Sequence, residues 1–175
     1  MRNKAWRLLP FLLILTNNSF SQDDPEFPKG FVMHAKLHHG MITTFHAGAD
    51  LFVGGFQLIP QFTIVPQKLR AGAVAGVFYA SQQWQAAAGP TLSLKLKTFN
   101  AGAFGSAANI HLTLDHLWGT KKQQLLGGGI HLDLLNKLTL GPTVHRDYKL
   151  NTWWFQFALG LRISKKEKIT EPFNN

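Results

Sequence analysis

The stretch TWWFQFALGLRI, residues 152–163, decides the fold. An α-helix would place the polar Gln156 and the small Gly160 in the middle of its apolar stripe. A β-strand turns successive side chains to opposite faces, and a period of two fits every apolar position here. The stretch is therefore predicted to be a strand with one apolar face and one small or polar face. The apolar face would carry Trp153, Phe155, Phe157, Leu159, Leu161 and Ile163.

The same alternation recurs along the chain. The run without charge from Ala71 to Leu94 has a polar centre at 81–85, so it predicts two strands and not a membrane-spanning helix. Short turn-like stretches separate the alternating segments, and no helical pattern lies between them. This arrangement predicts an antiparallel all-β fold. The eight expected strands are 31–38, 49–59, 69–80, 91–97, 109–115, 130–134, 138–148 and 152–163.

The N-terminus has the pattern of a secretory signal peptide. A basic start is followed by an apolar core over 8–15 and by the small residues Ser19 and Ser21. We therefore expect an exported protein. The expected divisions are a signal peptide at 1–21, a lead-in at 22–30, a β-barrel at 31–163 and a basic C-terminal tail at 164–175.

Composition narrows the chemistry. The chain has no cysteine, which excludes disulfides, thiolate metal ligands, a cysteine nucleophile and a lipidated cysteine. The formal net charge is +9, but the basic residues are scattered, and nucleic acid is not an expected partner of an exported protein. The lysines at 165, 166 and 168 are first interpreted as a solvated tail. Contact with anionic lipid head groups or with an acidic envelope partner is the alternative.

Two barrel types satisfy the alternation. A soluble barrel turns its leucines inward, whereas a membrane barrel turns them outward against lipid. Tryptophan and tyrosine stand at the ends of the expected strands, beside loops, which is typical of a membrane interface. These interface residues are expected to be Tyr79, Trp84, Trp118, Tyr148, Trp153 and Trp154.

The polar faces of the expected strands also favour a membrane barrel. They mix charges of both signs with small residues, and only 15% of the chain is charged, which is low for a water-exposed exterior. An eight-stranded barrel is just wide enough for side chains to fill it, and buried ions need partners. The expected polar network of the lumen is His34, Lys36, Lys95, Lys97, His111, Asp115, His131, Asp133 and Arg162.

The signal peptide, the lead-in, the alternating strands and the aromatic-rich last strand together resemble the small outer-membrane β-barrel proteins of Gram-negative bacteria. The resemblance covers about residues 31–163. It implies a closed antiparallel up-and-down transmembrane β-barrel of about eight strands, surrounded by outer-membrane lipid. In that family the last strand usually ends the chain on an aromatic residue. Here residues 164–175 follow, so either 154–163 serves as an internal insertion signal or the tail has a role of its own.

The resemblance implies little about activity. The expected role is structural, or that of an accessory subunit which binds another envelope protein through its loops or tail. A wide pore is not expected, because eight strands leave a lumen that side chains fill. One alternative is a soluble periplasmic, lipocalin-like binder of an apolar ligand. Another is a lipid-modifying hydrolase or acyltransferase with Ser81, His116, His145 and Asp147 as its candidate residues.

The histidines raise a metal hypothesis, because imidazole with carboxylate suits zinc or iron. Their spacing matches no compact motif, so hydrogen bonding within the lumen is the preferred interpretation. No metal site, cofactor or catalytic residue is predicted. The histidines and carboxylates that could contribute ligands are His34, His38 and His39, and His111 and His131 with Asp115 and Asp133.

Overall fold

The computed structural model describes residues 30–44, 51–101, 106–134 and 137–163. The expected signal peptide, nearly all of the lead-in and the tail lie outside these ranges. The described residues include no helix that is long and apolar enough to cross a membrane. They form eight strands: β1 (Phe31–Thr43), β2 (Leu51–Val65), β3 (Leu69–Ala80), β4 (Gln83–Ala101), β5 (Ser106–Gly119), β6 (Gln124–Leu134), β7 (Leu138–Asp147) and β8 (Thr152–Ile163).

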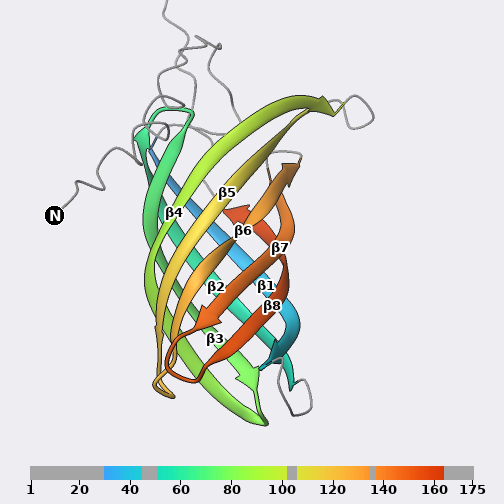
Figure 1. Cartoon of the computed structure of the whole chain (residues 1–175). Helices are drawn as coiled ribbons and strands as arrows, with labels where there is room; N and C mark the ends of the chain where they lie inside the picture. The colour runs from blue at the N-terminus through green and yellow to red at the C-terminus, as the bar shows by residue number, and fades with distance from the viewer. Residues whose placement is uncertain (1–29, 45–50, 102–105, 135–136, 164–175) are drawn as a thin grey trace, which may run out of the picture.

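The strands close into a barrel (Figure 1). Each pairs antiparallel with its neighbour in the chain, and β8 pairs with β1 from Met33 with Ile163 to Thr43 with Trp153. The predicted closed up-and-down antiparallel barrel of eight strands is therefore confirmed. The stretch 152–163 is the strand that closes it.

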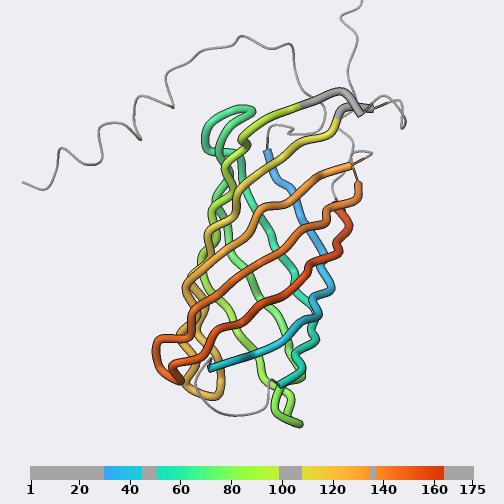
Figure 2. The backbone as a smooth tube through the Cα atoms, turned by 45° about the vertical axis from the view of Figure 1, so that its right-hand side comes forward, coloured from blue at the N-terminus to red at the C-terminus, as the bar shows by residue number. Residues whose placement is uncertain are grey.

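The two ends of the barrel are distinguished by the chain termini of β1 and β8 and by the turns that lie at each end. Figure 2 shows tilted strands running between an upper end, where β1 begins and β8 stops, and a lower end, where β1 stops and β8 begins. We call these the terminal end and the distal end. The β3–β4, β5–β6 and β7–β8 turns lie at the distal end. The β3–β4 turn has only two residues, Ser81 and Gln82, with φ of 51° and 60°, as in a tight hairpin turn that matches the twist of the strands.

Most strands are longer than the sequence predicts. β4 extends from Gln83 to Ala101, whereas only 91–97 shows clear alternation, because alanine and glycine over 86–89 carry no face preference. β2 continues to Val65 through a stretch expected to be a turn. Pro60 lies within this strand opposite Met33. Figure 1 shows β4 and β5 extending past the other strands at the terminal end.

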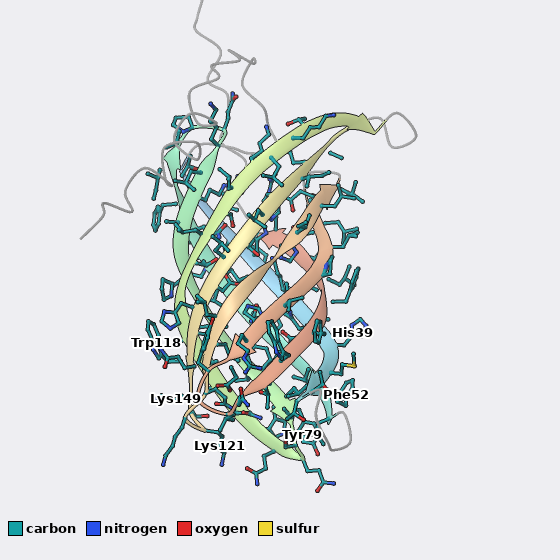
Figure 3. The ribbon with its side chains drawn as sticks, viewed as in Figure 1. His39, Phe52, Tyr79, Trp118, Lys121 and Lys149 are labelled. Atoms are coloured by element: carbon teal, nitrogen blue, oxygen red, sulfur yellow. The ribbon has the colours of Figure 1, made fainter. Side chains whose placement is uncertain are left out.

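The two faces of the wall differ sharply in polarity. The outward leucines are largely exposed: Leu37 is 60% exposed, Leu114 55% and Leu161 57%. The inward positions between them carry polar side chains, including Lys36, of which only 4% is exposed. A water-soluble protein normally buries the first kind of residue and exposes the second. Figure 3 shows side chains projecting outward along both sides of the barrel in this view.

Glycine allows close strand packing in β6. A Cβ atom added to Gly128 would collide with the backbone carbonyl of Thr113 on β5, and one added to Gly127 would collide with that of Val144 on β7. The run Gly127–Gly129 therefore belongs to the wall, where both neighbouring backbones approach it closely.

Candidate functional site

The candidate site is the polar lumen, because the buried charged side chains and most of the buried histidines lie there. Among the described residues, its polar side chains surround a small cavity with about 10 Å³ of free space. That is about the space of a single water molecule. The cavity is lined by His34, Lys36, His38, Gln57, Ile59, Gln61, Thr91, Ser93, His111, Thr113, Asp115, His131 and Thr143.

Lys36 lies at the centre of the lumen. Its Nζ atom is 3.4 Å from Nε2 of His131, whose ring stacks on that of His111 with 5.4 Å between the ring centroids. The carboxylates of Asp115 and Asp133 lie within electrostatic range of the ammonium group. A buried cation needs such partners, because nothing else replaces its lost hydration.

Asp133 is the centre of a second group of contacts. It accepts a 2.5 Å hydrogen bond from the hydroxyl of Thr139, and its other oxygen is 3.4 Å from Nδ1 of His111. The same Thr139 oxygen is 3.5 Å from Nδ1 of His34. Side chains of β1, β5, β6 and β7 are thus linked across the lumen.

A histidine–carboxylate pair lies nearer the distal end. Nε2 of His145 is 3.3 Å from Oδ2 of Asp115. Asp147 has a different role, because its Oδ1 accepts backbone hydrogen bonds from Gln124, Lys149 and Leu150 at 3.2, 2.9 and 3.0 Å. It therefore holds the β7–β8 turn and the start of β6.

Lys95 and Arg162 lie nearer the terminal end and are half-buried. Lys95 is opposite His111 on β5, and Arg162 is opposite His34 on β1. Lys97 departs from the expected lumen set. A β-bulge between Lys95 and Lys97 shifts the register by one residue, so that Lys97 pairs with the outward Ile110 and is exposed. A one-residue shift turns a side chain to the other face.

Trp154 departs from the expected interface set. It occupies an inward position of β8, is only 3% exposed and packs edge-on against Phe78 with 5.8 Å between the ring centroids. Alternation explains the difference, because the two adjacent tryptophans point to opposite sides of the wall. Trp154 belongs to an apolar plug that lies mainly inside the distal end and extends along β2 to Ile59, opposite His34. The plug consists of Ile42, Val53, Ile59, Val74, Phe78, Ala80, Ala87, Leu117, Leu125 and Trp154.

The other five expected interface aromatics lie at the distal end and outside the lumen. Tyr79 and Trp84 pair edge-on beside the β3–β4 turn, with 5.4 Å between ring centroids. The Trp118 ring is 4.4 Å from that of His116. The Arg146 guanidinium lies 5.1 Å from the centre of the Trp153 ring. Tyr148 is exposed in the β7–β8 turn.

Several lumen residues were missed by the sequence analysis. Gln61 donates a 2.8 Å hydrogen bond to Ser93, and Gln57 and Arg70 are buried. Alternation within 69–80 would have placed Arg70 on the inner face, since it shares the parity of Gly72 and Val74. No signal of this kind identifies the partner of each side chain.

The candidate residues of the enzymatic alternative are divided by the wall. Ser81 lies in the exposed distal turn, His116 lies outside against Trp118, and His145 lies inside with Asp115. His38 and His39 likewise lie on opposite faces. Across the described part of the chain, no three histidine, aspartate or glutamate side chains are placed to hold a metal ion together.

The interior therefore has two layers: a polar network around Lys36 and an apolar plug at the distal end. The cavity within the polar network holds no more than about one water molecule. A comparison with protein-family models and a comparison with curated proteins both find no match for this chain.

Proposed function

We propose that this chain is a small integral β-barrel protein of the Gram-negative outer membrane, with a structural or accessory role in an envelope assembly. One observation carries the proposal: the outer wall is apolar and the enclosed lumen is polar. Exposed outward residues such as Leu37, Leu114 and Leu161 contrast with the buried Lys36 and Asp133. Apolar surface costs about 25 cal/mol per Å² in water, so an apolar wall of this extent supports a location in which hydrocarbon covers it.

The interior supports this role over that of a lipocalin-like binder. Such a binder needs a cavity that accepts an apolar ligand, usually of a few hundred cubic ångströms. The lumen here holds a cavity of about 10 Å³ lined mostly by polar side chains.

The same filling argues against transport through the barrel. Ions or solutes would have to displace the network around Lys36 and then cross the plug around Phe78 and Trp154. Small barrels with filled interiors are suited to anchoring and to interactions through their ends. We therefore place any contact with another envelope protein at the loops or the basic tail.

Cell fractionation with electrophoresis tests the proposal. The protein is expected to sediment with outer membranes and to migrate faster in detergent gels when unboiled, because a closed barrel stays folded until heated. A soluble periplasmic lipocalin and a known outer-membrane barrel serve as controls. Recovery of the chain in the soluble periplasmic fraction would refute the proposal.

A further inference from the structure

An apolar groove crosses the outer face of β2 to β5 near the distal end. Strand register places Phe56, Val77 and Ala86 in one outward row, and Leu58, Ala75 and Ala88 in the next. The alanines form a low floor, the β2 side chains form one wall, and Trp118 forms the opposite wall. The groove has a volume of about 460 Å³, within the usual size range of ligand sites. Its lining is Phe56, Leu58, Ala75, Gly76, Val77, Ala86, Ala87, Ala88, Trp118 and Thr120.

The groove ends at a cationic turn. Thr120 closes it at the distal end and is fixed to Ala86 by two hydrogen bonds. The Ala86 amide donates to the threonine hydroxyl at 3.1 Å, and the Thr120 amide donates to the Ala86 carbonyl at 2.9 Å. The next two residues, Lys121 and Lys122, are both exposed. Figure 3 shows Trp118 and Lys121 at this end of the barrel.

The surrounding surface favours anions. Within the described ranges every carboxylate lies on the lumen side: Asp115, Asp133 and Asp147. The exposed charged side chains in the same ranges are all lysines, so among the described residues no exposed carboxylate weakens their field. They are Lys97, Lys121, Lys122, Lys137 and Lys149.

We propose that this groove is a specific site for one phospholipid with an anionic headgroup. An acyl chain lies on the alanine floor between Phe56 and Trp118, and the headgroup phosphate lies beside Lys121 and Lys122. The inference rests on the proposed membrane location. A second copy of the chain fits the groove poorly, because a two-fold interface would place the same lysines opposite each other and one concave surface against another.

Two pairs of variants in the full-length chain separate the parts of the site. The double variant Lys121→Gln, Lys122→Gln removes the headgroup contact, and its control is Lys97→Gln, Lys137→Gln at the terminal end. Ala88→Leu fills the groove from its floor. Its control is Ala73→Leu, an exposed outward residue of β3 outside the groove. Of the substituted residues, only Ala88 lines the groove. Lys121 and Lys122 lie in an exposed turn, so their replacement should leave the fold intact.

The assay has two steps. Flotation with vesicles first establishes whether the protein enters bilayers. Native mass spectrometry then compares retention of phosphatidylglycerol and phosphatidylcholine with the same acyl chains. Wild-type protein is expected to retain one phosphatidylglycerol in preference. Loss of two surface lysines should weaken that binding by about 30-fold, from roughly 1 kcal/mol for each lysine. Ala88→Leu should weaken binding of both lipids, and both controls should behave as wild type.

The outcomes distinguish this inference from the proposed function. A protein that does not float with vesicles refutes both. A protein that floats but retains the two lipids equally, or keeps its preference after loss of Lys121 and Lys122, refutes only the lipid site. A mass that corresponds to a lipid-free dimer also refutes it, because a second copy would then cover the groove. If Ala88→Leu does not fold, the lysine variants alone decide the question.

Discussion

Replacement of Leu114 by arginine tests whether hydrocarbon covers the barrel wall. Leu114 is an outward residue of β5, four positions before Trp118. With a rise of about 3.4 Å per residue and a tilt of about 40°, that spacing is roughly 10 Å along the barrel axis. In the proposed membrane barrel the apolar band would be about 25 Å tall, so a residue this far from the aromatic end would lie near the bilayer midplane.

The depth of the substituted residue in the bilayer determines the expected loss of stability. A lipid-facing arginine near the midplane costs about 2–4 kcal/mol, whereas one near the interface costs about 0–1 kcal/mol. Ile163→Arg is the matched control, because Ile163 is also outward and exposed but lies at the last position of β8. Leu114→Arg should therefore lower the free energy of unfolding by at least 1 kcal/mol more than Ile163→Arg.

Urea unfolding in vesicles of a short-chain phosphatidylcholine measures this difference. Tryptophan fluorescence follows the transition, and the mobility shift on heating reports the folded fraction independently. On a water-exposed surface both substitutions would change stability by only about 0.5 kcal/mol. Equal and small effects of the two arginines would therefore contradict a lipid-covered wall.

Three further predictions concern the interior and the wall. Lys36→Met leaves nearby carboxylates without their cation and should lower the free energy of unfolding by about 3–5 kcal/mol; a loss under 1 kcal/mol in urea titrations would exclude this electrostatic role. Gly128→Ala places a methyl group against the β5 backbone and should cost about 1–3 kcal/mol. Gly54→Ala should cost less, because only the movable Phe52 ring lies close, at 3.1 Å. In planar bilayers the wild-type protein should give no stable conductance steps, and regular steps would contradict the filled lumen.

The fold was predictable because one face of each strand differs so strongly from the other. Where apolar and polar residues alternate cleanly, as in β8 and β1, the period alone identifies strand and face. Strand ends were predicted less well. Over 86–89 the sequence AAAG has no polarity contrast, and its place in β4 is set by pairing with β3. Pairing between strands is a long-range property that a local pattern does not contain.

The lumen shows a second limit of what alternation can predict. Alternation assigns a side chain to a face only while the register is unbroken, and the bulge before Lys97 breaks it. It also says nothing of what lies across the lumen, so the contact of Lys36 with His131, 95 positions apart, follows only from closure of the barrel.

Trp154 illustrates that a residue's place along a strand does not predict its surroundings unless the face of the wall on which it lies is also known. A tryptophan beside a turn suits a membrane interface only when its position is outward. Trp153 has that parity, whereas the next residue must point inward and therefore packs on Phe78. Its burial helps to seal the distal end of the lumen, below the polar network. The dipeptide Trp153–Trp154 thus contributes to both sides of one wall, and exchange of either residue for a polar one should affect a different property. In the proposed membrane barrel, Trp153→Gln should weaken anchoring at the membrane interface, whereas Trp154→Gln should admit water to the plug.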